Sequence, residues 1–395
     1  MLDWLIIGGG LHGTYLSLLL TQRLAVPRKR LRVLDPHDQP LAVWQHFTQN
    51  CGMAYLRSPA THNIDLGIMS LHRFVRARGG PESHDFVDPY YRPRLELFNA
   101  HCRDVIARYG LDDLRVHGRA LTARPGTTGI EVETATDSIT TRRLLLAVGV
   151  SDAPSWPPWA VSLHQAGAPV AHIFDLAFNR QTLTGDFRIA IIGGGISAAQ
   201  TALAVSRQVD HPVTLVTRHP LNQSTYDFDP CWIGPKCLNG FYQTPYHQRR
   251  GVVDAARRPG TVPPDVWAAL HEAINQHRVR VEVGDVGQAT CKSGEIRLYL
   301  DSAPLPVDCV LLATGFETGR PGGTFVDRLI RNFQLPCTPN GYPVIQPDLS
   351  WRRGIYVTGS LAELQVGPCA RNIIGIRNAG RLLAEGLGFS RNRDS

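Results

Sequence analysis

The fold is decided near the amino terminus by the stretch Trp4-Leu5-Ile6-Ile7-Gly8-Gly9-Gly10-Leu11-His12-Gly13. Its apolar residues predict a short buried strand, and its glycines have the spacing G-x-G-x-x-G that leads into a helix. Gly8 permits a tight turn, Gly10 lets the backbone approach a pyrophosphate, and Gly13 lets the helix pack closely on the strand. A pyrophosphate would then lie on the free N–H groups at the helix start.

An acidic residue supplies the context that a lone glycine motif lacks. The next apolar strand, Leu31-Arg32-Val33-Leu34, ends in Asp35, 22 residues after Gly13. A carboxylate at this place accepts hydrogen bonds from an adenosine ribose. The alternative, a glycine-rich turn in an ordinary α/β core, leaves Asp35 unexplained. The amino-terminal part is therefore predicted to bind a dinucleotide.

The same pattern returns in the middle of the chain. Residues 187–199 again predict a strand, a glycine turn and a helix, with Ala198 at the third glycine position, a change that the fingerprint tolerates. The following strand, 213–217, ends in Arg218 instead of an acid. A guanidinium grips a ribose 2′-phosphate that a carboxylate would repel, which favours NADP over NAD. The alternative is a solvated charge at a strand end.

Two fingerprints of opposite ribose preference imply two cofactors, FAD first and NADPH second, with hydride passing between them. The predicted fold class is α/β, with two Rossmann-like three-layer dinucleotide-binding domains and the NADPH domain inserted into the FAD domain. The predicted boundaries are 1–160 for the first part of the FAD domain, 161–317 for the NADPH domain with an aromatic loop insertion, and 318–395 for the C-terminal part of the FAD domain.

Composition narrows the class of protein. The formal net charge is +7, but the basic residues are scattered, so nucleic-acid binding is not expected. No apolar run approaches the roughly 18 residues of a membrane helix, and the amino terminus lacks the pattern of a signal peptide. The eight cysteines contain no CxxC and no metal-ligand spacing. We therefore expect reduced thiols in a cytoplasmic protein without a metal.

Further elements are expected along the chain. Helices are predicted over 66–78, 94–109 and 266–277, and a last helix from near 367–372 to about Glu385. Residues 221–250 are expected to form a long aromatic loop region of unknown role. The polar and aromatic stretch 51–65 is expected to line a site, where Arg57 and His62 contact cofactor or substrate or, alternatively, satisfy buried carbonyl groups.

These motifs together resemble the two-dinucleotide-binding-domain flavoproteins, and among them the lysine/ornithine N-hydroxylase type of class B flavin-dependent monooxygenases. The resemblance covers most of the chain, including His172 in the linker and the segment from Asp308 to Phe316, which is similar to D-x-x-x-L-A-T-G-[FY]. It implies an FAD site of Gly8, Gly10, Leu11, His12, Gly13, Asp35, Trp44, Gly149, Gly359, Gly367 and Asn372. It implies an NADPH site of Gly193, Gly195, Ile196, Ser197, Ala198, Thr217, Arg218, Thr314 and Gly315.

The chain departs from the family at several points. Gly359-Ser360 stands where the family often has G-D, and no His-Pro follows the A-T-G segment. The first fingerprint, residues 8–13, lacks the G-x-G-P form of the N-hydroxylases, and the chain is somewhat short.

The resemblance implies a monooxygenase that consumes NADPH and oxygen and acts through a C4a-hydroperoxyflavin on a small nucleophile. Among such reactions, the N-hydroxylation of an amine is the one we expect. The candidate residues that line the flavin and substrate are Arg57, His62 and Asn372. The helix start at 367–372 is expected to point its N–H groups at the flavin pyrimidine edge. No acid–base side chain is strictly required.

Two alternatives stay open at this point: an NADPH-dependent flavin reductase serving a quinone or protein, and a cofactor-binding protein without turnover. Disulfide-reductase chemistry is disfavoured, because no CxxC exists. The expected partners are a small-molecule substrate and molecular oxygen, with no nucleic acid or membrane. A homo-oligomer is possible.

Overall fold

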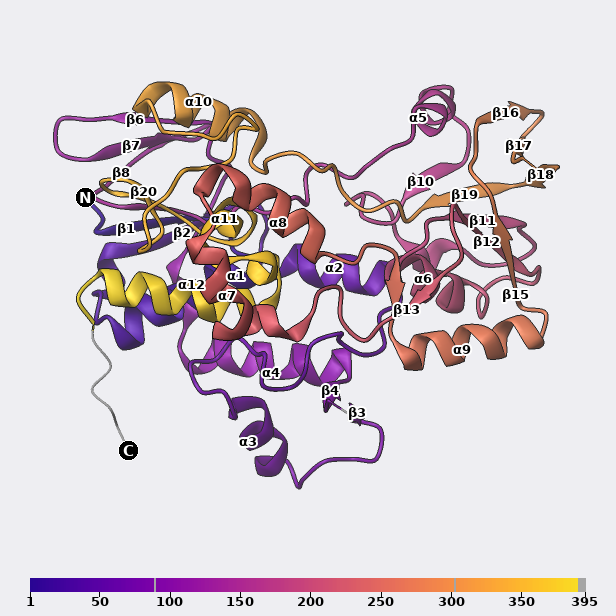
Figure 1. The fold of residues 1–395 in the computed structure, drawn as a ribbon, viewed down its shortest axis with the longest axis horizontal. Coiled ribbons are helices and arrows are strands. Elements are labelled where there is room, and N and C mark those ends of the chain that lie inside the picture. Colours follow the sequence, from indigo (N-terminus) through magenta and orange to yellow (C-terminus); the bar gives the residue numbers. More distant parts are fainter. Residues whose placement is uncertain (89, 302, 390–395) are drawn as a thin grey trace.

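The computed structural model describes residues 1–88, 90–301 and 303–389. Two parallel sheets dominate it, one at the left of Figure 1 and one at the right. The first sheet has the order β20-β21-β9-β1-β2-β5. Its strands are β1 (Trp4–Ile7), β2 (Leu31–Asp35), β5 (Arg115–His117), β9 (Leu144–Leu146), β20 (Ser350–Arg352) and β21 (Ile355–Val357). Only the edge pair β20–β21 is antiparallel among them.

The second sheet has the order β10-β19-β11-β12-β15 and is parallel throughout. Its strands are β10 (Val170–His172), β11 (Ile189–Ile192), β12 (Val213–Thr217), β15 (Val279–Val283) and β19 (Cys309–Leu312). The order β19-β11-β12-β15 repeats β9-β1-β2-β5 of the first sheet, so the two fingerprints occupy equivalent places in two equivalent units.

Smaller sheets complete the strands. They are formed by β3 (Phe86–Val87) with β4 (Arg92–Pro93), by β6 (Thr122–Pro125), β7 (Ile130–Glu133) and β8 (Ser138–Thr141), by β13 (Asn222–Gln223) with β14 (Thr261–Val262), and by β16 (Gln288–Lys292), β17 (Glu295–Tyr299) and β18 (Pro304–Val307).

The α-helices are α1 (Leu11–Leu18), α2 (Ala42–Asn50), α3 (Ser70–Ala77), α4 (Leu95–Arg108), α5 (Pro158–Gln165), α6 (Ile196–Val205), α7 (Pro235–Gln243), α8 (Arg249–Ala256), α9 (Pro264–Asn275), α10 (Gly323–Phe333), α11 (Glu363–Val366) and α12 (Ile373–Gly386). Single turns are η1 (Leu19–Arg23), η2 (Arg28–Arg30), η3 (Leu111–Leu114), η4 (Arg180–Thr182), η5 (Pro230–Ile233), η6 (Tyr246–Gln248), η7 (Gly359–Ala362) and η8 (Pro368–Arg371).

Alternation along each central strand produces three layers. On β11, Ile189 and Ile191 pack with α6 and α9, whereas Ala190 faces the opposite core with α5 and the β16–β18 sheet. The central strand of a parallel sheet is buried on both faces, which explains its unbroken apolar sequence. The predicted fold class, two Rossmann-like units with the second inserted into the first, is confirmed. The boundaries at 160/161 and 317/318 stay a prediction.

Two crossing segments join the units and pair with each other. The Ser155 N–H donates to the Gly315 carbonyl at 2.9 Å, and the Glu317 N–H donates to Ala153 at 2.9 Å. In Figure 1 these segments run across the top between the sheets. The proline-rich stretch 151–159 is therefore a crossover between the units.

The structure of residues 221–250 differs from the aromatic loop that the sequence led us to expect. The structure forms η5, α7, η6 and the start of α8 there instead of a continuous aromatic loop. Pro230 and Pro235 each stand at the first helical position, where a missing N–H costs nothing. The aromatic side chains belong to the core: Phe241 is buried and packs with Tyr342 and Leu364 of the C-terminal part.

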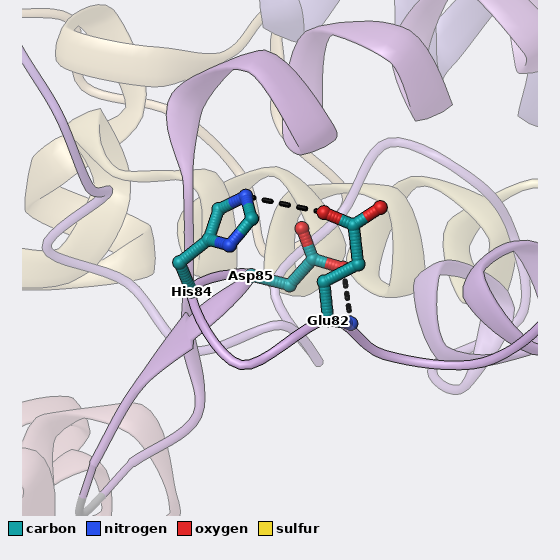
Figure 2. A group of neighbouring side chains, drawn as sticks. All are labelled: Glu82, His84 and Asp85. Carbon is teal, nitrogen blue, oxygen red and sulfur yellow. Dashed lines mark hydrogen bonds and ion pairs between the residues drawn. The ribbon is translucent and has the colours of Figure 1, made fainter.

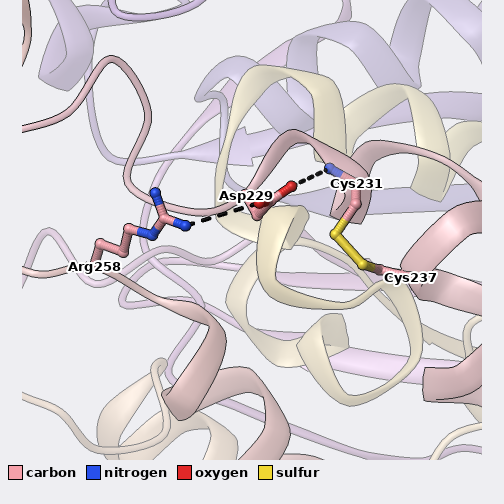
Figure 3. Close-up of a disulfide and its surroundings, with 4 residues drawn as sticks. All are labelled: Asp229, Cys231, Cys237 and Arg258. Atoms are coloured by element: carbon pink, nitrogen blue, oxygen red, sulfur yellow. Dashed lines mark hydrogen bonds and ion pairs between the residues drawn. A yellow bond between two sulfur atoms is a disulfide. The ribbon is translucent and has the colours of Figure 1, made fainter.

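The cysteines correct another expectation. Cys231 and Cys237 form a disulfide, with their Cα atoms 5.3 Å apart, rather than two reduced thiols (Figure 3). The turn from η5 into α7 brings them together, since Asp229 accepts the Cys231 N–H at 2.9 Å and ends the preceding loop. The other six cysteines are free, as expected.

Among the described residues, no helix combines the length and apolarity that a membrane crossing requires.

Candidate functional site

The first glycine turn has no room for side chains except at one position. Gly8 has φ +108°, and a β-carbon there would lie 2.6 Å from the Ala147 carbonyl oxygen. A β-carbon on Gly13 would lie 1.8 Å from the Gly8 carbonyl oxygen. Around Gly10 nothing lies within 4 Å of such an atom, and no side chain caps the start of α1. The turn is thus tightly packed on the protein side and open where a pyrophosphate would approach.

Asp35 is fixed at the end of β2 against this turn. Its Oδ2 atom accepts the Gly9 N–H at 2.6 Å, and its Oδ1 atom accepts the His37 N–H at 2.9 Å. Each carboxylate oxygen keeps a further acceptor site. The geometry fits the predicted ribose contact beside the turn.

His12, in the first turn of α1, connects the turn with the C-terminal part. Its Nδ1 atom lies 2.8 Å from Thr358 Oγ1, and its Nε2 atom is buried without a partner in the described part of the chain. Burial lowers the pKa of His12 to about 4, so the ring is neutral at pH 7. Gly359, with φ +63°, lies directly over the ring.

The second turn repeats this construction. Gly193 has φ +154°, and a β-carbon there would lie 2.4 Å from the Ala313 carbonyl oxygen, as at Gly8 and Ala147. Ala198 is buried beneath the turn. Gly195 precedes α6 without a side-chain cap. A β-carbon on Gly194 would meet Thr217 Oγ1 at 2.7 Å.

Arg218 follows β12 at the open edge of this turn. Its side chain is exposed and forms no hydrogen bond or ion pair within the described residues. Thr217, by contrast, is buried and donates to the His219 carbonyl at 2.7 Å. Arg218 is therefore free for a phosphate group, whereas Thr217 shapes the strand end.

Thr314 and Gly315 lie in the crossover between the units. The side chain of His172 lies beside Thr314 there. Thr314 Oγ1 donates to the Ser155 carbonyl and lies 3.3 Å from His172 Nε2. His172 Nδ1 accepts the Phe174 N–H at 3.1 Å. Burial lowers the pKa of His172 to about 4, so it is a neutral structural partner at pH 7.

Arg57 is held between the units. Its guanidinium donates to the Thr225 and Ser224 carbonyls at 2.8 and 2.9 Å and to Thr261 Oγ1 at 2.7 Å. It satisfies carbonyl groups, which is the alternative that the sequence left open. It thereby anchors residues 224–225 beside the 51–65 stretch.

Asn372 and His62 both lie near α12. Asn372 is the N-cap residue of α12, and its Nδ2 atom donates to Asp227 Oδ1 at 3.4 Å. His62 is 9% exposed, and burial together with nearby Arg377 lowers its pKa to about 4. The structure does not bring Arg57, His62 and Asn372 into mutual hydrogen-bonding contact.

The remaining predicted residues take supporting places. Trp44, on α2, donates its indole N–H to Asn99 at 3.0 Å. Gly367 has φ +91° and packs so closely on Leu238 of α7 that a β-carbon would meet it at 2.9 Å. Leu11, Ile196 and Ser197 form the first turns of α1 and α6, and Gly149 lies in the loop after β9.

Sequence reasoning missed residues that join distant segments. Arg92 is buried and forms an ion pair with Asp265 of the second unit. Glu363 is fully buried and binds Arg250, Arg257 and Arg371. No local motif marks these residues, because their partners lie far away in the sequence.

Glu82, His84 and Asp85 lie close enough to hold a cation (Figure 2). They are already partnered: His84 lies 3.1 Å from Glu82, and Asp85 binds Arg94 at 3.4 Å and the Glu82 N–H at 3.0 Å. The group is explained by its own contacts.

Comparison with known proteins agrees with this geometry. The family model for L-lysine 6-monooxygenase/L-ornithine 5-monooxygenase matches residues 113–292, and the FAD-NAD(P)-binding model matches residues 5–151. A search of curated proteins gave no significant match.

Solved structures share the fold over nearly the whole chain. The FAD-bound cadaverine monooxygenase of Erwinia amylovora is 16% identical, with a TM-score of 0.75 over 98% of this chain and 94% of that one. The ornithine hydroxylase of Pseudomonas aeruginosa is 17% identical, with a TM-score of 0.75 over 98% of both chains. The L-lysine 6-monooxygenase of Pseudomonas syringae is 18% identical, with a TM-score of 0.70 over 99% of this chain and 100% of that one. Two family models thus match overlapping parts of the chain, one for FAD-NAD(P)-binding and one for L-lysine 6-monooxygenase/L-ornithine 5-monooxygenase, and the chain has the two-unit fold of these monooxygenases, which it resembles.

Proposed function

We propose that the chain is an FAD-dependent, NADPH-consuming monooxygenase that hydroxylates the nitrogen of a small amine. The observation that carries the proposal is the pair of equivalent glycine turns, of which one ends beside Asp35 and the other beside the unpartnered Arg218. A carboxylate suits the free ribose of FAD, and a free guanidinium suits the 2′-phosphate of NADPH.

The chain's own residues bind and shield the reacting groups. FAD held at the first glycine turn and by Asp35 would, once reduced, supply the oxygen-activating chemistry. The open faces at Gly10 and Gly195 admit the two pyrophosphates to the starts of α1 and α6. The α12 start at Asn372 offers free N–H groups toward negative charge on the flavin.

The histidines support a mechanism without a general base. Burial lowers the pKa of each of His12, His62 and His172 to about 4. A general base works best with a pKa near the operating pH, and these rings are far from it at pH 7. A neutral amine that attacks an activated oxygen directly needs no such base.

The test is anaerobic reduction by NADPH followed by rapid mixing with oxygenated buffer. A lasting spectral intermediate, distinct from reduced and oxidised flavin, supports the monooxygenase. Cadaverine, ornithine and lysine are then compared by the rate at which each discharges it. Immediate return to oxidised flavin in the absence of amine, with no hydroxylated product when an amine is added, favours the reductase alternative, and a failure of NADPH to reduce the flavin leaves the cofactor-binding protein.

A further inference from the structure

A hollow lies between the two units, away from both glycine turns. Its volume is about 610 Å³, and its walls come from α2 and α4 of the first unit and from η4 and the end of α6 of the second. Figure 1 shows α2 extending from the first sheet toward α6. The contact at its edge is tight, since a β-carbon on Gly52 would lie 2.3 Å from the Ala204 β-carbon.

The hollow and the NADPH turn lie at opposite ends of α6. On α6, the NADPH turn precedes Ile196, whereas the hollow is lined by Ala204 and Arg207. At 1.5 Å per residue, Ala204 lies about 12 Å along the helix from Ile196. On α2, the end near the FAD turn is held by the Leu41 N–H, which donates to the Gly9 carbonyl at 3.0 Å. The hollow is lined by Gln45, Thr48 and Gln49, so it extends from the second turn of α2 to its other end.

Uncompensated positive charge lines this hollow. Arg103 and Arg207 come from opposite units, are exposed, and form no side-chain hydrogen bond or ion pair within the part of the chain that the structure describes. Arg180 lies between them in the chain and donates only to uncharged acceptors, the Gln49 carbonyl and Gln208 Oε1. The acid in the lining, Glu96, binds Arg94 at 3.4 Å.

The rest of the wall is mixed. Gln45 and Gln181 bring amide groups, and Met53, Leu95 and Ala204 bring apolar surface. Guanidinium groups bind carboxylate and phosphate oxygens with paired N–H donors, and amides add neutral donors.

We propose that this hollow binds a small polyanion, a metabolite with carboxylate or phosphate groups at two ends, which bridges Arg103 of the first unit and Arg207 of the second. The ligand would join the two units beside α2, which begins near the FAD turn, and at the end of α6, which begins at the NADPH turn. The lining contains none of the glycines of the two cofactor turns, and the inference does not depend on the proposed function.

Calorimetric titration of the FAD-loaded protein tests the proposal, with citrate and inorganic pyrophosphate as probes at constant ionic strength. Saturating NADP⁺ is present, so that Arg218 is occupied. We expect binding of one probe per chain. Citrate binding alone identifies a carboxylate ligand and pyrophosphate binding alone a phosphate ligand, and either result supports the site.

Variants locate the binding. Arg103→Ala and Arg207→Ala should each weaken it about tenfold or more, because a charge-assisted hydrogen bond is lost. Arg103→Lys should retain part of it. Arg353→Ala is the matched control, since this exposed arginine lies outside the hollow and should leave binding unchanged. The proposal is overturned by no binding at millimolar probe, by binding that NADP⁺ abolishes, or by equal weakening in the control. Flavin content and melting temperature verify that each variant is folded.

Discussion

Gly13 lies so close to Gly8 that a β-carbon on Gly13 would come within 1.8 Å of the Gly8 carbonyl oxygen. The turn and the helix that follows it therefore form one packed unit. Gly10, between them, has open space where a side chain would point and an ordinary φ of −72°. The same motif thus contains one glycine required for packing and one required for the ligand.

This difference predicts opposite phenotypes. Gly13→Ala should destabilise the protein by about 3 kcal/mol, since backbone must move to admit the methyl group. Gly10→Ala should leave the apoprotein within about 0.5 kcal/mol of the parent, because the site is open and the backbone suits alanine. It should nevertheless lose FAD, since the methyl group takes the space of the pyrophosphate. Urea unfolding of the apoproteins and flavin absorbance per protein measure the two effects; equal stability of both variants would contradict the assignment.

We expect Asp35 to hold FAD in the protein. Asp35→Ala removes the acceptor of the Gly9 N–H as well as the ribose contact, and should purify largely without flavin. Asp35→Asn keeps one carbonyl oxygen as acceptor and should retain an intermediate amount. Flavin content after gel filtration distinguishes the variants. An Asp35→Ala protein that purifies fully loaded would count against the ribose contact.

We expect Arg218 to determine the preference for NADPH over NADH. Arg218→Ala should raise KM for NADPH about 10- to 100-fold, the equivalent of a charge-assisted hydrogen bond, and leave KM for NADH nearly unchanged. Flavin reduction by each nucleotide is the measurement. Arg280→Ala is the control, an exposed arginine on the neighbouring strand β15. Equal effects on both nucleotides would show that Arg218 does not read the 2′-phosphate.

His172 predicts a dependence of stability on pH. Burial lowers its pKa to about 4 in the folded protein, against about 6.5 in the unfolded chain. Between these values only the unfolded chain binds the proton. The free energy of unfolding is therefore highest above pH 6.5 and falls as the pH drops toward 4, by up to about 1.4 kcal/mol per pH unit for this residue.

Urea unfolding at several pH values between 7.5 and 5 checks this. His172→Asn, which can still accept the Phe174 N–H, should show a shallower loss than the parent. The exposed residue His271 gives the control, and His271→Asn should keep the parent slope. An unchanged slope in His172→Asn would mean that this ring does not remain neutral in the fold.

The sequence predicted what is encoded locally. Both glycine turns, the ends of β2 and β12 and most long helices follow from short-range spacing, and the structure has them. Residues 221–250 were expected to be a loop, because their aromatic residues lack a clear helical period. The helix α7 depends instead on distant contacts, such as that of Leu238 with Gly367. The partners of Arg57 could not be predicted, since residues 224, 225 and 261 meet it only through the packing of the two units.

Glu363 is the sharpest case of such a nonlocal residue. Its carboxylate is fully buried, and although burial opposes ionisation, Arg257, Arg371 and Arg250 hold its pKa below the usual range. Glu363→Gln should destabilise the protein by about 3–5 kcal/mol, because it leaves partly buried guanidinium groups without their anion. Glu295→Gln is the control: this acid also binds two arginines, Arg188 and Arg297, but at the surface, where water screens the charges, so its replacement should destabilise the protein much less. Denaturant unfolding compares the two. If Glu363→Gln proved as mild as the control, the buried cluster would not be what holds α8 and η8 against α11.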